Sequence, residues 1–229
     1  MQVLGHNDYY KAYDDRYKKV YKEKMLWASR INTREVEQVI LEKKISCNNS
    51  ILEVGCGEGR DAIYLLNQGY NVTALEYSIS AICKCNELSN NKYVDKFIQF
   101  DLLNDILDSK YDFIYSIAVL HMFVLDEHRK KFWLFVKEHL QKDAFALICV
   151  MGDGKTKYCS DISKSFIEVK RTVQNVDKDI LVASTSCRIV DWKTLEKEII
   201  SSGLVINKKW ISNDIPEFDS SMCVLVSNN

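Results

Sequence analysis

The sequence has one proline, Pro216, no C-x-x-C pair and no long apolar run. The longest such run, residues 144–151, is too short to cross a bilayer, and the N-terminus lacks a basic segment followed by an apolar one. We therefore expect neither a membrane span nor a secretion signal. The 8 cysteines are scattered, which favours buried free thiols in a reducing compartment over disulfides or a zinc site. These absences predict a cytoplasmic protein without a metal centre.

An excess of charge is also missing, because 31 Lys and Arg residues nearly balance 32 Asp and Glu residues. Such a chain has no electrostatic reason to bind nucleic acid or an anionic membrane. With 229 residues it is long enough for one α/β domain with a small elaboration, but too short for two full domains. No repeat or low-complexity segment divides it. We expect a single domain over residues 1–229, as a monomer or a homodimer.

The most informative stretch is residues 50–61, Ser-Ile-Leu-Glu-Val-Gly-Cys-Gly-Glu-Gly-Arg-Asp. Its first half is an apolar, β-branched run typical of a buried parallel strand. Its glycines then let the backbone turn sharply and approach a bound molecule without a Cβ in the way. A helix follows, with apolar residues on one face and Gly69 at its end. A ligand at this turn would lie at a helix N-terminus.

The spacing of the glycines indicates the kind of ligand. A dinucleotide fingerprint reads G-x-G-x-x-G and places a pyrophosphate at the helix N-terminus. This chain reads G-x-G-x-G, with Arg60 where the third glycine would stand. Glu53, on the strand before the turn, would repel a pyrophosphate but could pair with an ammonium group. The pattern favours a nucleoside that carries an amino acid over a dinucleotide.

Two further acids follow predicted strands. Glu76 ends an apolar run about 20 residues after the glycine turn, the distance at which a carboxylate can reach both ribose hydroxyls, although nicotinamide enzymes share this spacing. Asp101 follows the next strand, at residues 96–100. Any one of these acids could simply cap a helix or face solvent. Together with Glu53 they would surround a cationic ligand that contains adenosine.

The segment Glu53-Val54-Gly55-Cys56-Gly57-Glu58-Gly59 resembles the first motif of class I S-adenosylmethionine-dependent methyltransferases. The pattern looks closest to their small-molecule branch, which includes tellurite-resistance and thiopurine-type enzymes. The resemblance covers residues 50–229, and its specific motifs occupy residues 53–121. It implies a Rossmann-like doubly wound sheet in an α-β-α sandwich, with seven mostly parallel strands and an antiparallel last strand. The cofactor-binding residues it implies are Glu53, Gly55, Cys56, Gly57, Gly59, Arg60, Glu76, Tyr77, Asp101, Leu102 and Ala118.

The N-terminal segment is rich in tyrosine. Residues 8–25 place Tyr10, Tyr13 and Tyr17 at helical spacing, which predicts an amphipathic helix. These rings could pack on the domain as ordinary core. The resemblance suggests instead that residues 1–45 cover the cofactor, where aromatic rings can shield a sulfonium cation. The candidates for that role are Tyr9, Tyr10, Tyr13, Tyr17 and Trp27.

The fourth predicted strand, residues 111–116, leads to His121 and Met122. Ligands of open α/β sheets bind beyond the carboxyl ends of the strands, so His121 is the candidate general base. A lone histidine is more often structural, and that alternative stays open.

After the fifth strand, residues 145–151, the regular alternation stops. Residues 166–173 and 180–190 look like two strands around a polar turn at 175–179. The resemblance makes residues 152–190 an inserted substrate cover, whereas the plainer interpretation is a surface hairpin. The residues of this insertion that could contact the acceptor are Asp153, Asp161, Ser186, Cys187 and Arg188. The acceptor-binding candidates of the whole chain are Tyr10, Tyr13, Tyr17, Trp27, Met122 and Arg188.

The remainder completes the fold. Asp191 is expected to cap the last helix, which ends at Gly203, and residues 204–211 and 222–226 are expected to pair as a hairpin around Pro216. Two strands in succession after a βα series match the closing topology of the family.

The resemblance implies transfer of a methyl group from S-adenosylmethionine to a small acceptor through an O, N or S nucleophile. The reaction is an in-line displacement, so the protein contributes mainly alignment and desolvation. No Asn-Pro-Pro-Tyr-type signature is present, which argues against exocyclic amines of DNA or RNA. One alternative is a non-catalytic sensor of S-adenosylmethionine or a partner subunit with the same fold. A nicotinamide oxidoreductase is disfavoured by Arg60 and Glu53.

Overall fold

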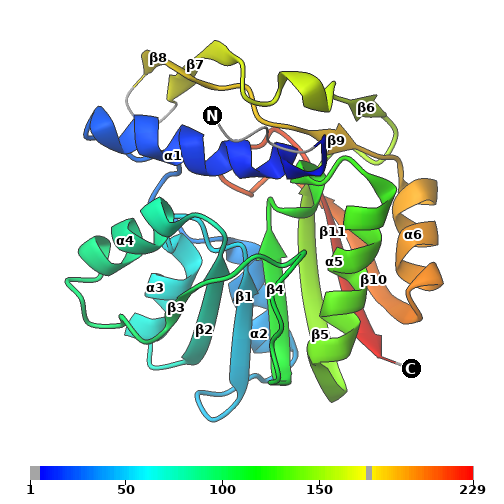
Figure 1. Ribbon diagram of the computed structural model, residues 1–229. Coiled ribbons are helices and arrows are strands. Elements are labelled where there is room, and N and C mark those ends of the chain that lie inside the picture. The colour runs from blue at the N-terminus through cyan, green and yellow to red at the C-terminus, as the bar shows by residue number, and fades with distance from the viewer. Residues whose placement is uncertain (1–5, 174–176, 229) are drawn as a thin grey trace.

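The computed structural model describes residues 6–173 and 177–228, in which a seven-stranded sheet lies between two layers of helices (Figure 1). In spatial order the strands are β10 (Leu204–Ser212), β11 (Ser221–Asn228), β5 (Leu140–Met151), β4 (Tyr111–Ile117), β1 (Ser50–Val54), β2 (Asn71–Glu76) and β3 (Phe97–Gln99). Neighbours from β5 to β3 are parallel, whereas β11 is antiparallel to both β5 and β10. The predicted doubly wound, mostly parallel sheet with an antiparallel last strand is confirmed.

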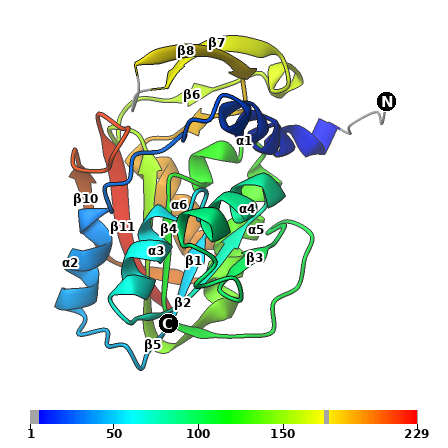
Figure 2. The same ribbon diagram turned by 90° about the vertical axis from the view of Figure 1, so that its left-hand side faces the viewer.

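The helices cover both faces of the sheet (Figures 1 and 2). They are α2 (Arg34–Glu42), α3 (Arg60–Asn67) and α4 (Ile79–Leu88) on one face, and α5 (Asp126–His139) and α6 (Trp192–Ser201) on the other. Each face has its own apolar cluster. Leu65 of α3 lies in the cluster under α2, α3 and α4, and Trp133 of α5 lies in the cluster under α5 and α6. Strands β1 and β4 are buried on both faces, which explains why their sequences are apolar without alternation.

The helix ends follow the sequence signals. Ser78 caps α4 by accepting a hydrogen bond from the Ala81 amide, and Asp191 caps α6 by accepting one from the Thr194 amide. Gly69 follows α3 with φ +87°, a conformation that a glycine adopts without strain. The predictions for Asp191 and Gly69 are confirmed.

A separate covering layer of helices and short strands lies over the carboxyl ends of the parallel strands. It is formed by η1 (His6–Lys11), α1 (Ala12–Lys22), η3 (Ile162–Lys164), the antiparallel pair β7 (Glu168–Val173) and β8 (Lys178–Ala183), and the short pair β6 (Tyr158–Cys159) and β9 (Arg188–Ile189). Figures 1 and 2 show α1 between the β7–β8 hairpin and the sheet. Val20 of α1 packs with Val173, Ile180 and Val182 of the hairpin, so the two segments form one apolar cluster.

Several boundaries differ from the sequence prediction, most of all in the hairpin, at the N-terminal helix and at the start of β5. The strand predicted for residues 180–190 is present but its extent is wrong, because β8 ends at Ala183 and Thr185 has φ +63°. The amides of Ser184 and Thr185 donate to the carbonyls of Ile167 and Ser165, and these contacts bend the chain out of the extended conformation. The N-terminal helix begins as the 3-10 turn η1, and β5 begins at residue 140 instead of 145. Part of the predicted turn, residues 174–176, lies outside the described residues.

Within residues 6–173 and 177–228, no helix combines the length and the apolar composition that crossing a bilayer requires.

Candidate functional site

A cavity of about 670 Å³ lies at the carboxyl ends of β1, β2 and β4, below α1 and the β7–β8 hairpin. Open α/β sheets bind ligands at this edge, and the volume suits a small organic molecule. His121 and the residues of the cofactor-binding and acceptor-binding sets all line this cavity, except Gly59 and Arg188; the further candidates Tyr9, Asp153 and Asp161 do not. The fold therefore brings together side chains that the sequence spreads from Tyr10 to Met122.

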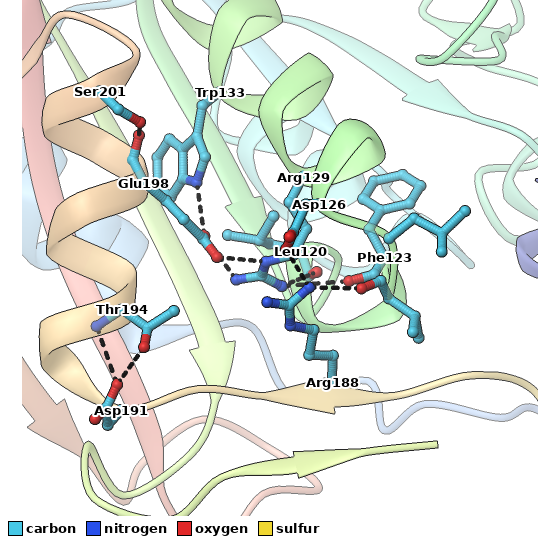
Figure 3. A network of polar contacts seen from close by, with 12 residues as sticks. Leu120, Phe123, Asp126, Arg129, Trp133, Arg188, Asp191, Thr194, Glu198 and Ser201 are labelled. Carbon is cyan, nitrogen blue, oxygen red and sulfur yellow. Dashed lines mark hydrogen bonds and ion pairs between the residues drawn. The ribbon is translucent and has the colours of Figure 1, made fainter. Parts of the chain in front are cut away.

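The two exceptions have other contacts. A Cβ at Gly59 would lie 2.9 Å from Sγ of Cys85, so this glycine lets the turn pack against α4. Arg188 donates from Nη1 to the carbonyl of Val124 at 2.7 Å and to Oδ1 of Asp126 at 2.6 Å (Figure 3). It ties β9 to the start of α5 and does not face the cavity.

Three other candidates also form local structural contacts. The hydroxyl of Tyr9 is buried and accepts from the Val124 amide. Asp153 accepts from the Thr156 amide of its own loop, and Asp161 caps η3. Ser186 and Cys187 do line the cavity, so only part of the predicted insertion faces it.

At Gly55 and Gly57, in the turn after β1, the backbone lies too close to neighbouring side chains to leave room for a Cβ. Gly55 has φ +76°, and a Cβ there would lie 2.3 Å from Cγ2 of Val119. Gly57 has φ +53°, and a Cβ there would lie 2.7 Å from Oη of Tyr17, at the cavity wall. Both positions need the left-handed conformation and the space that glycine leaves. The turn therefore exposes backbone to whatever the cavity holds.

Glu53 ends in the cavity as a buried acid, 3% exposed, that accepts a hydrogen bond from the Tyr115 hydroxyl at 3.0 Å. Burial raises the pKa of Glu53 well above its usual range, and the nearby Asp61 raises it further. A cation placed against this carboxyl would stabilise its charged form. An ammonium group beside the glycine turn fits that requirement.

The other two acids already have partners within the chain. Glu76 accepts from the amides of Gly57 and Ser78, both at 2.9 Å, and burial raises its pKa. Asp101 accepts at Oδ2 from the Tyr10 hydroxyl at 2.7 Å. Each carboxylate oxygen has two lone pairs, so both acids keep capacity for a ligand donor. The contact between Tyr10 and Asp101 was not foreseen from the sequence.

His121 lies on η2 (Leu120–Met122) and is 5% exposed. Its Nδ1 is buried and has no hydrogen-bond partner in the described part of the chain. Its ring lies 5.6 Å from the Phe218 ring in an edge-on arrangement. Burial lowers the pKa of His121 to about 3, and the positive charges of Arg129 and Arg16 contribute. The imidazole is therefore neutral at pH 7 and a weaker base than the sequence led us to expect.

A buried guanidinium holds the turn that carries His121 (Figure 3). Arg129 of α5 is 2% exposed and donates from Nη1 to the carbonyls of Leu120 at 2.9 Å and Phe123 at 3.4 Å. Its Nε and Nη2 each donate to a carboxylate oxygen of Glu198 on α6 at 2.8 Å. Trp133 donates to the same carboxylate at 3.2 Å. This network joins α5, α6 and η2.

The sequence interpretation missed several residues of the cavity wall. Glu58 accepts from the Trp27 amide at 2.8 Å and so anchors the N-terminal segment on the glycine turn. Glu217 accepts from Nη1 of Arg60 at 3.0 Å and brings the loop between β10 and β11 to the cavity. Arg16 lies on the same helix face as the predicted tyrosines, which is the signal that could have identified it. No local pattern marks Glu217.

No group of three or more His, Cys, Asp or Glu side chains within residues 6–173 and 177–228 is arranged to hold a metal ion.

Solved structures share this fold. An S-adenosylmethionine-dependent methyltransferase from Clostridium acetobutylicum superposes with a TM-score of 0.64 at 17% identity, over 87% of this chain and 93% of that one. The glycopeptide N-methyltransferase MtfA, in complex with S-adenosylmethionine, gives 0.63 at 16% identity, over 86% of this chain and 87% of that one. At these identities the likeness concerns the fold alone.

Curated relatives match parts of the sequence. A probable S-adenosyl-L-methionine-dependent methyltransferase TehB from Haemophilus influenzae is 28% identical over 129 residues, which are 56% of this chain and 45% of the relative. A ubiquinone biosynthesis O-methyltransferase from Rickettsia typhi is 32% identical over 139 residues, which are 56% of this chain and 53% of the relative. The chain thus spans about half the length of these relatives.

The match to a family model is longer. Residues 16–181, well over half of the chain, match the model described as tellurite resistance protein TehB. This range includes the greater part of α1, the glycine turn, all three strand-end acids, η2, β7 and part of β8. The chain belongs to the TehB family.

Proposed function

We propose that this chain is an S-adenosylmethionine-dependent methyltransferase that acts on a small molecule. The observation that carries the proposal is Glu53, a buried acid at the end of β1 beside a glycine turn that a Cβ would fill. The cavity volume and the names of the curated relatives support it. A dinucleotide would bring a pyrophosphate next to Glu53, which disfavours nicotinamide chemistry.

The residues of the cavity fit the parts of this cofactor. Glu53 would hold the ammonium group, Glu76 the ribose hydroxyls and Asp101 the adenine amino group. The backbone of Gly55 and Gly57 would lie against the methionine part. The bound cofactor supplies a methyl group made electrophilic by a sulfonium.

The chain contributes mainly alignment and exclusion of water. We assign the cover of the site to residues 1–45 and 152–190, whose described parts place α1 and the hairpin above the cavity. Tyr17 and Trp27 provide aromatic faces beside the glycine turn, which suit a sulfonium cation. A ring nitrogen of the neutral His121 can accept a hydrogen bond or a proton from the methyl acceptor.

Calorimetry with S-adenosylmethionine, S-adenosylhomocysteine and NAD tests the cofactor. We expect the first two to bind, and Glu53→Gln to weaken their binding about 10- to 100-fold, because a charged hydrogen bond is lost. Glu35→Gln is the matched control, since Glu35 is also a buried acid but lies on α2 and does not line the cavity. Binding of NAD alone would reject the proposal.

A panel of thiols, amines, phenols and carboxylic acids, with a labelled methyl donor, tests the activity. Product formation with any acceptor supports the enzyme. Tight cofactor binding with no product across the panel would favour a sensor or a partner subunit.

A further inference from the structure

The hairpin end of the cavity contains a buried guanidinium that has no carboxylate partner in the part of the chain that the structure describes. Arg16 of α1 is 8% exposed, and its Nη2 donates to the carbonyls of Ala183 at 3.2 Å and Ser184 at 2.8 Å and to the Thr185 hydroxyl. Its Nε is buried and has no hydrogen-bond partner among the described residues. No ion pair involving Arg16 is found in residues 6–173 and 177–228. A buried charge without a counter-ion is unfavourable.

A second guanidinium lies on the same wall. Arg171 of β7 lines the cavity and is exposed to it, and it too forms no ion pair with any described residue. Both arginines line the same cavity, and the pKa of Arg16 is lowered by burial and further by the positive charge of Arg171. An anion between them would relieve both the repulsion and the missing partner.

The acids of the cavity do not fill that role, because each is engaged elsewhere. Their described partners are the Tyr115 hydroxyl for Glu53, the Trp27 and Ala28 amides for Glu58, Thr33 and Arg60 for Asp61, the Gly57 and Ser78 amides for Glu76, Tyr10 for Asp101, and Arg60 for Glu217. The cavity is therefore divided by charge. Its acids surround the glycine turn, and its unpaired cations lie at the hairpin.

Aromatic rings hold the guanidinium of Arg16 in place. Its Cζ lies 4.5 Å from the Trp27 ring centroid and 5.2 Å from the Tyr13 ring centroid. Such contacts orient a planar guanidinium, and its Nε and Nη1, which have no acceptor among the described residues, remain for a flat, bidentate partner. A carboxylate has that shape.

We propose that the methyl acceptor is a small organic anion whose carboxylate binds Arg16 and Arg171, with its nucleophilic atom directed toward His121 and the glycine turn. This inference rests on the proposed function and names its substrate class. A lone pair of the nucleophilic atom forms the bond to the methyl carbon, and the carbon–sulfur bond breaks toward sulfur. A proton carried by the nucleophile passes to His121 or to water.

Matched probes test the anion site directly. 4-Mercaptobenzoate and 4-mercaptobenzamide have the same ring and thiol, but the group opposite the thiol is an anionic carboxylate in the first and a neutral amide of similar size in the second. Calorimetry of each, with the protein saturated by S-adenosylhomocysteine, should show the benzoate binding about 10- to 100-fold more tightly, as expected for charge-assisted hydrogen bonds. Added salt should reduce this preference.

Three single variants test which residues cause the preference for the benzoate over the benzamide. Arg171→Gln removes an exposed side chain without a described ion pair, so the protein should fold normally and lose most of the preference for the benzoate. Arg16→Lys keeps the charge but not the two-pronged donor, and it should lose part of the preference. Lys170→Gln is the control, because Lys170 lies next in β7, pairs with Asp179 and does not line the cavity. It should bind both probes as the wild type does.

Equal binding of the two probes to the wild type would overturn the inference. An unchanged preference for the benzoate in both single variants, Arg171→Gln and Arg16→Lys, would overturn it as well. Failure of the proposed function would look different. S-adenosylhomocysteine would then fail to bind, whereas the preference for the benzoate, measured again without S-adenosylhomocysteine, would still decide whether the anion site exists.

Discussion

The Arg129–Glu198 pair in Figure 3 provides a quantitative test of how the site is held. The change Arg129→Met removes a guanidinium that is 2% exposed and keeps an apolar side chain of similar length. It leaves the carbonyls of Leu120 and Phe123 without this donor and leaves Glu198 without its cation. The perturbation therefore acts on both the α5–α6 contact and the turn that carries His121.

The expected loss of unfolding free energy is about 3 kcal/mol, at the lower end of the range for removing one partner of a buried ion pair. The lower end applies because the Glu198 side chain is 18% exposed, so water can partly hydrate the orphaned carboxylate. Domains of this kind have total stabilities of about 5 to 15 kcal/mol, so the variant should still fold. Arg188→Met should cost less than about 1 kcal/mol, because its partner Asp126 is 88% exposed.

Urea unfolding measures both values, with the m-value as a check that the denatured state is unchanged. Adding Glu198→Gln to Arg129→Met should recover about 1 kcal/mol, since the orphaned charge is removed while Trp133 keeps an acceptor. Acceptor turnover should fall in Arg129→Met while the cofactor dissociation constant stays unchanged. A loss no larger than that of Arg188→Met, or simple additivity in the double variant, would refute the reasoning.

Three further predictions concern the cavity. Gly57→Val should fold but should bind no S-adenosylmethionine in calorimetry. Gly57 has φ +53°, and a Cβ there would lie 2.7 Å from the Tyr17 hydroxyl, so a branched side chain does not fit. Normal binding would mean that the turn does not hold the cofactor. Glu76→Ala and Asp101→Ala should each weaken cofactor binding by about 1 to 3 kcal/mol, and unchanged affinity in both folded variants would contradict their assignment. His121 has a pKa of about 3 in the folded protein against 6.5 in the unfolded chain, so the unfolded state binds more protons between these values and stability should fall as the pH drops through them. His121→Gln should flatten that acid slope in urea titrations, and a wild-type rate limb near pH 6.5 that the variant lacks would show that the cofactor or acceptor restores its basicity.

Much of the fold followed from patterns a few residues long. The glycine turn, the cap residues Ser78 and Asp191 and the strands before Glu53, Glu76 and Asp101 depend on local backbone geometry and on burial of short apolar runs. Parallel strands end at one edge of their sheet, so the order of these segments was enough to bring three acids to one cavity. The part of the cavity around the glycine turn, where we propose that the cofactor binds, was therefore accessible from the sequence.

The rest of the cavity wall was not, because it is built by contacts between distant segments. Arg16 reaches Thr185 across 169 positions, Arg60 reaches Glu217 across 157, and Arg129 reaches Glu198 across 69. The misjudged strand at 180–190 has the same origin, since backbone contacts from residues 165 and 167 bend the chain near Thr185. Charge pairing and pKa depend on which groups share a buried volume. Burial by other segments made His121 a neutral imidazole and left Arg16 without a counter-ion among the described residues. Only the tertiary structure determines such neighbours.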